Sequence, residues 1–322
     1  MYIGVDIGGT KCAVVLGDEV GVKKKIRFAT TTYEETMQNI INAIAEMGEA
    51  DAIGISCGGP LNSKTGVILS PPNLPGWDDI HITEMLTEKF GISAFLCNDA
   101  DACALAEWKY GAGVGTENMI FLTFGTGMGA GLILNGRLYS GTAGMAGEVG
   151  HMRMSEYGPV GYGKRGSFEG FCSGGGIGRL GQTLAREKLQ MGQTLPYCKN
   201  ESELPLITAK ILAEYADKGE PVALETYRIC GEKLGAGLAV LVDILNPEMI
   251  VIGSVFQRAE HLLRPHMEKV LKREALSFAR ELCRVVPAKL ADDIGDYAAL
   301  SVAGEGLRHS PSNLSTERKY IP

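Results

Sequence analysis

The chain has 322 residues and a formal net charge of −7 at pH 7, with 31 Lys and Arg against 38 Asp and Glu. An acidic chain lacks the basic surface of a dedicated nucleic-acid binder. Its longest apolar run, 234–245, is interrupted by Asp243 and falls short of the ~18 residues of a membrane span. Glycine is the outlier, with 43 residues and no collagen period, so we expect it in specific turns and ligand loops.

Eight cysteines are scattered mostly through apolar segments, and no two of them form a Cys-x-x-Cys pair. The N-terminus has neither a basic region nor a small-residue cleavage site, so it does not resemble a secretory signal. Because thiols stay reduced in the cytoplasm, we predict free cysteines in a cytoplasmic protein.

The first part of the chain predicts a β-meander followed by alternating helices and strands. Thr32 and Glu35 have the spacing of a capping box, and apolar residues from Met37 to Met47 recur behind it at helical spacing. The predicted strands are 2–6, 12–16, 24–30, 52–56 and 94–97, and further helices are predicted at 83–90 and 100–110.

The same pattern restarts at residue 119. An apolar strand, 119–124, enters Gly125-Thr126-Gly127 just as strand 2–6 enters Gly8-Gly9-Thr10. Asn135-Gly136 is typical of a type I′ hairpin turn. The remaining predicted strands are 131–134, 137–139 and 249–252, and the predicted helices are 206–217, 221–245 and 261–273. The chain therefore contains one unit twice, which is a clue to its fold.

Each unit opens with a glycine-rich loop that can carry chemistry. In the loop 6–11, two glycines let backbone N–H groups approach an anion, Thr10 adds a hydroxyl, and Asp6 can hold a hydrated Mg²⁺; a tight turn without a ligand is the alternative. The loop 125–131 matches a dinucleotide-binding fingerprint, but a hairpin follows it where a Rossmann site requires a helix. Two such loops in duplicate units favour a pair of phosphate-binding hairpins facing across a cleft.

Five segments in a fixed order resemble the ROK family of sugar kinases. They are DIGGTK at 6–11, NDADACALAE at 98–107, FGTGMGAG at 124–131, GEVGH at 147–151 and NPEMIVIG at 246–253. The resemblance covers about residues 1–305. It implies a duplicated actin-like, ribonuclease H-like α/β ATPase fold with a central cleft between two domains. The small domain would be 1–115 joined by about 297–308, the large domain 116–296, and 309–322 a flexible tail.

The resemblance also implies roles for individual residues. Asp99 matches the general base that takes the proton from a sugar hydroxyl, whereas the alternative from the sequence alone is a simple N-cap of the helix beginning near Ala100. The implied sugar-binding residues are Gly59, Asn73, Asn98, Asp99, Glu148, His151 and Glu169. The implied ATP-binding residues are Asp6, Gly8, Gly9, Thr10, Lys11, Gly125, Thr126, Gly127, Gly175, Gly253 and Ser254.

The sequence departs from the family at its zinc segment. Most members follow the histidine with C-x-C-G-x-x-G-C-x-E, and the three cysteine positions here hold Val160, Tyr162 and Ser167. His151 without thiolates does not make a tetrahedral zinc site, so we predict no zinc. We expect Val160, Tyr162 and Phe168 to fix the loop by packing, and His151 to be free to contact the sugar.

The resemblance implies an ATP- and Mg²⁺-dependent kinase that converts glucose to glucose 6-phosphate. N-acetylmannosamine, N-acetylglucosamine, fructose, allose and β-glucosides stay open as substrates, because sugar discrimination depends on one or two contacts. A ROK transcriptional regulator is disfavoured because the first strand begins at Tyr2. A non-catalytic sugar-binding protein is a further alternative. We expect a homodimer, and neither a nucleic-acid nor a membrane partner.

Overall fold

The computed structural model describes residues 1–309. Its first five-stranded sheet has the order β3-β2-β1-β4-β7, in which β2 runs antiparallel to both of its neighbours, β1 and β3, and β4 and β7 run parallel to β1. The strands are β1 (Tyr2–Ile7), β2 (Lys11–Gly17), β3 (Val22–Ala29), β4 (Ala52–Cys57) and β7 (Ser93–Asn98). Its helices are α1 (Tyr33–Met47), α2 (Ile82–Phe90) and α3 (Asp99–Tyr110).

The second sheet repeats this order, as β10-β9-β8-β13-β14. Its strands are β8 (Met119–Leu122), β9 (Ala130–Leu134), β10 (Arg137–Leu138), β13 (Met249–Ile252) and β14 (Arg284–Pro287). Asn135 and Gly136 have φ values of 53° and 67°, as a type I′ turn requires. The identical strand order confirms the predicted duplication.

Further helices and short elements complete the fold. The helices are α4 (Phe168–Phe171), α5 (Gly174–Gln190), α6 (Ala209–Ala216), α7 (Pro221–Leu245), α8 (Val255–Glu274), α9 (Ser277–Leu282) and α10 (Ile294–Arg308). The 3₁₀ turns are η1 (Val149–His151), η2 (Glu201–Leu206) and η3 (Ala291–Asp293). Two small hairpins are β5 (Leu61–Asn62) with β6 (Val67–Ile68), and β11 (Val160–Gly161) with β12 (Lys164–Arg165).

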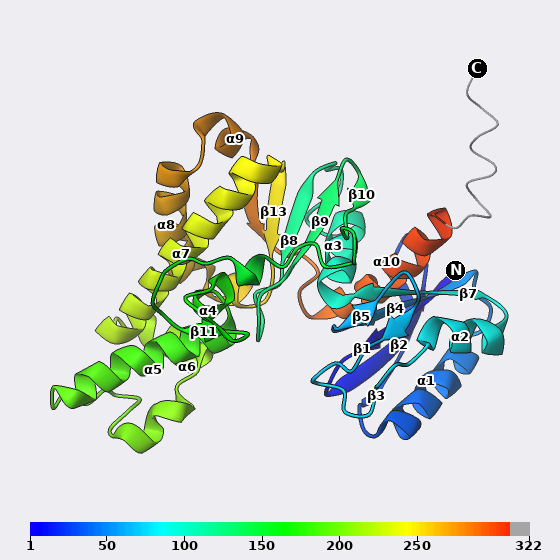
Figure 1. Cartoon of the computed structure of the whole chain (residues 1–322), viewed down its shortest axis with the longest axis horizontal. Coiled ribbons are helices and arrows are strands. Elements are labelled where there is room, and N and C mark those ends of the chain that lie inside the picture. Colours follow the sequence, from blue (N-terminus) through cyan, green and yellow to red (C-terminus); the bar gives the residue numbers. More distant parts are fainter. Residues whose placement is uncertain (310–322) are drawn as a thin grey trace.

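The alternation of side chains assigns one helix layer to each face of the first sheet. Ile3 and Val5 point into a core that contains residues of α1. Gly54 points the other way: a Cβ there would lie 2.2 Å from the Ala299 carbonyl oxygen, so only glycine lets α10 pack this closely. Figure 1 shows α3 and α10 between the two sheets, where α10 covers β1 and β4 while α3 also packs on β8 and β9.

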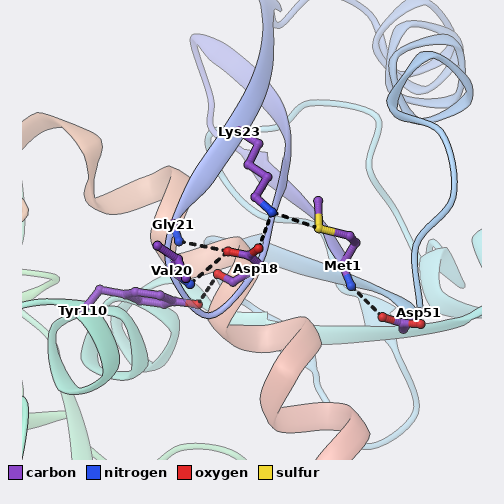
Figure 2. A network of polar contacts seen from close by, with 7 residues as sticks. All are labelled: Met1, Asp18, Val20, Gly21, Lys23, Asp51 and Tyr110. Atoms are coloured by element: carbon purple, nitrogen blue, oxygen red, sulfur yellow. Dashed lines mark hydrogen bonds and ion pairs between the residues drawn. The ribbon is translucent and has the colours of Figure 1, made fainter.

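Polar contacts tie down the edge of the first sheet near the N-terminus (Figure 2). The Met1 ammonium pairs with Asp51 at 2.6 Å, and the Lys23 ammonium pairs with the Asp18 carboxylate. Tyr110, at the end of α3, donates its hydroxyl to the Asp18 carbonyl oxygen at 3.0 Å. The β2–β3 turn is thus anchored on α3 as well as on its own strands.

Two predicted helix starts were wrong. The helix expected at 206–217 begins at Ala209, because Thr208 caps it after a 3₁₀ turn that contains Pro205. The helix expected at 261–273 begins at Val255 and has a kink at Ala259. Strand β14 and helix α9 were missed. The predicted tail lies outside the described residues except for His309, and the predicted domain boundaries stay a prediction.

Candidate active site

Both glycine loops form tight turns at the same place in their sheets. The Gly8 amide donates to the Lys11 carbonyl oxygen at 3.2 Å, and the Gly125 amide donates to the Gly127 carbonyl oxygen at 3.1 Å. Gly9, Thr10 and Thr126 are exposed at the tips of these turns. Exposed amides and hydroxyls of this kind form a cradle for an anion.

The second loop meets two other predicted nucleotide contacts. The Gly174 amide donates to the Gly125 carbonyl oxygen at 2.7 Å, which brings the N-terminus of α5 against the loop. A Cβ on Gly125 would lie 3.8 Å from the Ser254 hydroxyl oxygen, and the Gly253 amide donates to Leu122 at 3.0 Å. The structure therefore brings together the loop, Gly175, Gly253 and Ser254. A helix N-terminus adds partial positive charge at this place.

A carboxylate pair lies beside the first loop. Asp6 is the residue before the last of β1, and its carboxylate packs against Gly295, where a Cβ would lie 2.5 Å from Oδ2. Burial is the main cause that raises the pKa of Asp6 to about 6, and the negative charges of Asp296 and Asp99 add to it. Lys25 forms an ion pair with Asp296. Nothing in the sequence around Asp6 signals Asp296, because the two residues lie at opposite ends of the chain.

Asp99 is the first residue of α3. The N-cap is Asn98, whose Oδ1 accepts from the Ala100 amide at 3.0 Å, so the alternative that Asp99 is the N-cap was wrong. Asp99 Oδ1 accepts from the same amide at 2.8 Å. Its side chain is exposed, yet so much protein surrounds it that desolvation raises its pKa, and Glu148 adds to the rise.

The predicted sugar-binding residues come from both halves of the chain. A Cβ on Gly9 would lie 2.7 Å from the Asn73 carbonyl oxygen, and one on Gly59 would lie 3.4 Å from Asn98 Nδ2. These contacts place Asn73, Gly59 and Asn98 on the side of the first loop and of Asp99.

Glu169 lies on the side of the second loop. Its Oε2 accepts from the Met128 amide at 3.0 Å, so the carboxylate is held against this loop. Glu148 is exposed, and its charge acts on both Asp99 and Asp101. This interaction links the loop that carries Glu148 to the start of α3.

The segment after His151 is organised differently from our expectation. Phe168 is fully buried, but Val160 is 42% exposed and Tyr162 is 80% exposed, so these two side chains contribute little buried surface to the loop. Backbone hydrogen bonds hold it instead, for example from the Phe168 amide to the Met152 carbonyl oxygen at 2.8 Å. The His151 ring packs edge-on against Tyr162, with centroids 5.5 Å apart.

The described residues 1–309 contain no cluster of three or more His, Cys, Asp or Glu side chains suited to a metal. Cys172 does not point toward His151; its sulfur lies 4.0 Å from that of Cys230 on α7. The donor set around His151 therefore does not fit a structural zinc ion.

Asp101 is a further buried carboxylate near Asp99 that was not predicted from the sequence. This residue is 6% exposed and accepts a hydrogen bond from the Ser140 hydroxyl at 3.2 Å. Burial, with Asp99 and Glu148 adding to it, raises the pKa of Asp101 to about 7. Its position two residues after Asp99 was the available signal. Ser140 lies on the segment that leads to Glu148, so this hydrogen bond connects that segment to the start of α3.

Two copies of a five-stranded α/β unit, each with a glycine turn at the same place, define the duplicated actin-like ATPase fold. A family model described as "ROK family" matches residues 2–305. A glucokinase from Thermotoga maritima is 33% identical over 95% of this chain and 98% of its own length. The chain belongs to the ROK family.

Two further relatives differ in their described roles. A ROK family glucokinase from Streptomyces griseus, solved in complex with glucose and AMPPNP, has a TM-score of 0.74 and 29% identity, covering 95% of this chain and 99% of that one. A xylose repressor from Caldicellulosiruptor bescii is 26% identical over 90% of this chain and 74% of its own length. The family therefore includes both kinases and repressors, and membership alone does not distinguish the two roles.

Among the described residues, none of the helices has the length and the apolar composition of a membrane-spanning segment.

Proposed function

We propose that this protein transfers the γ-phosphoryl group of ATP to a hydroxyl of a hexose, converting glucose to glucose 6-phosphate, with Asp99 as the general base. The observation that carries the proposal is the Asp99 carboxylate at the start of α3, which lies beside Gly58 and is close enough to Asp6 and Glu148 for their charges to interact. The glucokinase relatives support glucose as the substrate.

The proposed chemistry needs positioning and charge neutralisation more than covalent catalysis. Asp99 accepts the proton of the attacking sugar hydroxyl, and its raised pKa makes it a better match to neutral pH than an ordinary aspartate. Phosphoryl transfer has a loose transition state, so the amides of the two loops and of the α5 N-terminus stabilise charge on the phosphates. The proposed sugar ligands are Gly59, Asn73, Asn98, Glu148, His151 and Glu169.

The residues present fit ATP and Mg²⁺. The second loop with Gly175, Gly253 and Ser254 would hold the nucleotide, and Gly8, Gly9, Thr10 and Lys11 would hold its terminal phosphates. The Asp6 carboxylate would hold Mg²⁺ through water, and the ion would neutralise phosphate charge when bound. Lys11 and Lys25 lower the pKa of Asp6 and so favour its ionised form, against the larger effect of burial.

An Asp99→Asn variant tests the base. The amide keeps the oxygen that accepts from Ala100 but removes the proton acceptor. We expect kcat with glucose to fall by roughly 10² to 10⁴, while glucose affinity by calorimetry stays within about threefold of the wild type. Asp78→Asn, an exposed substitution, is the control. An Asp99→Asn enzyme that retains wild-type kcat would refute the assignment.

A sugar panel separates the remaining alternatives. Turnover measured with glucose, the two N-acetylhexosamines, fructose, allose and a β-glucoside identifies the substrate. Saturable sugar binding with no turnover of any of them would favour a sensor, as in the repressor relatives.

Metal analysis of the purified protein tests the zinc prediction. We expect much less than one zinc ion per chain, because the segment 160–167 offers no thiolate. One tightly held zinc per chain would contradict this.

The homodimer and the cytoplasmic location stay predictions.

A further inference from the structure

Outside the candidate active site, a cavity of about 370 Å³ lies between the β11–β12 hairpin and one face of α5. Figure 1 shows β11, α4 and α5 close together in this part of the molecule. Three arginines line the cavity, Arg165 from the hairpin and Arg179 and Arg186 from α5, together with Thr183. We call this cavity the arginine pocket. At ~30 Å³ per water molecule, it has room for a small organic phosphate.

Among the described residues, none of the three guanidinium groups has a carboxylate partner. Within residues 1–309, no Asp or Glu oxygen lies within the 4.0 Å of an ion pair from Arg165, Arg179 or Arg186, and no acidic residue lines the pocket. Other arginines in this acidic chain, such as Arg228 and Arg264, pair with two carboxylates each. The pocket is therefore a local concentration of uncompensated positive charge.

The helix geometry puts the arginines on one side. Arg179, Thr183 and Arg186 follow the spacing at which side chains share a helix face. Arg179 and Arg186 are two turns apart, about 10 Å along the axis at 1.5 Å per residue. A guanidinium binds phosphate through two parallel N–H donors, so this spacing suits a ligand with a phosphate group and a second polar end.

Hydrogen bonds to backbone carbonyl oxygens hold the opposite wall of the pocket, the β11–β12 hairpin. The Gly166 amide donates to the Pro159 carbonyl oxygen at 2.9 Å, and Arg153 Nη1 donates to the Arg165 carbonyl oxygen at 2.9 Å. Gly166 has a φ of 64°, and a Cβ there would lie 2.1 Å from the Ser155 carbonyl oxygen. The hairpin thus keeps Arg165 over α5 before any ligand binds.

The pocket adjoins the candidate active site through Arg179. A Cβ on Gly175 would lie 3.1 Å from Arg179 Nη1 and 3.3 Å from the Thr126 carbonyl oxygen. The hairpin also leads directly into α4, which carries Glu169. A ligand in the pocket would tie the hairpin to α5 and restrain the segment that positions Glu169.

We propose that the arginine pocket is a second anion site that binds a phosphorylated small molecule beside the catalytic site. The shared chemistry is a phosphate group held by guanidinium forks. The ligand comes either from inorganic phosphate chains or from sugar phosphates, and the two sources are distinguished by the probes below.

Binding is measured by calorimetry with sodium tripolyphosphate and with glucose 6-phosphate, at matched ionic strength and without turnover. The wild type is compared with Arg165→Gln/Arg186→Gln, which spares Arg179 and the glycine loops. The control is Arg27→Gln/Arg284→Gln, which removes the same charge at two exposed arginines without ion pairs elsewhere in the described chain. Because the readout is binding, a failed kinase assay would leave this test intact.

We expect at least one probe to bind the wild type and the control equally, and to bind the pocket variant about tenfold more weakly or worse, since two charge-assisted contacts are lost. Loss for tripolyphosphate alone identifies a phosphate chain, and loss for glucose 6-phosphate alone identifies a sugar phosphate. Equal affinities in all three proteins, or no binding of either probe in the millimolar range, would overturn the proposal. If the glutamine variant unfolds, Arg165→Lys/Arg186→Lys keeps the charge, loses the forks and should still bind more weakly.

Discussion

The two glycine turns have the same backbone position but different chemistry. Two residues before Gly8 stands Asp6, whose pKa is raised to about 6 by burial and by neighbouring carboxylates. Two residues before Gly125 stands Thr123, whose hydroxyl oxygen accepts from the Gly129 amide at 2.8 Å and closes its own loop. The two turns therefore differ at this position: the first carries a carboxylate whose ionised form is disfavoured by burial, and the second carries a hydroxyl that stabilises its own loop.

The two units also exchange their last helices. The α3 helix follows the first sheet but packs on β8 and β9, and α10 follows the second sheet but packs on β1 and β4. Glycines mark both contacts, because a Cβ on Gly131 would lie 2.5 Å from the Ala104 Cβ, much as Gly54 meets Ala299. The negative charges of Asp99 and Asp296, near the starts of these helices, both act on Asp6.

The largest loss of stability should come from adding a side chain where these helices pack closely on a glycine. Gly54→Val and Gly131→Val each push a side chain into helix backbone, so we expect a loss of more than about 3 kcal/mol or no folded protein. Ser93→Val, on an exposed strand position, should change stability by less than about 0.5 kcal/mol. Urea unfolding measures all three. If one glycine tolerates valine, the two helix contacts are not equivalent.

Asp6→Asn should change the free energy of unfolding by less than the glycine substitutions do, and it should increase it. A raised pKa means that the folded state holds the proton more tightly than the unfolded chain does. The stability from this group is therefore present below about pH 4 and is lost as the pH rises through about 6. Asp6→Asn should gain up to about 3 kcal/mol at pH 7 and little at pH 4, while losing kinase activity. Urea unfolding at both pH values measures this, and a gain that is equal at the two would contradict it.

Thr123→Val should cause the smallest change in the free energy of unfolding. The change keeps the shape but removes the hydroxyl that accepts from Gly129, which costs about 1 kcal/mol. Because no ionisable group is altered, the loss should be the same at pH 4 and pH 7. Thermal unfolding at the two pH values therefore sharpens the contrast with Asp6. A pH-dependent loss would show that the two turns are coupled.

Much of the fold was predictable because its signals are local. Apolar runs with period two, the Asn135-Gly136 turn and the Thr32 cap each depend on a few neighbouring residues. Helix starts failed where a proline or a kink interrupts the pattern, as before α6 and within α8. The resemblance of five short segments to one family carried the proposed site, and the structure brings those segments together.

The sequence by itself determined the duplicated unit, the two glycine turns, the position of Asp99 and the loss of the zinc cysteines, since each is a property of short stretches of chain. Only the tertiary structure decided which groups face one another. Three contacts join residues that are distant in sequence. The Asp296 charge acts on Asp6, the Ser140 hydroxyl donates to Asp101, and Arg165 lines a pocket with residues of α5. Burial and neighbouring charge set the pKa values of carboxylates, and both exist only after the sheets and exchanged helices have packed.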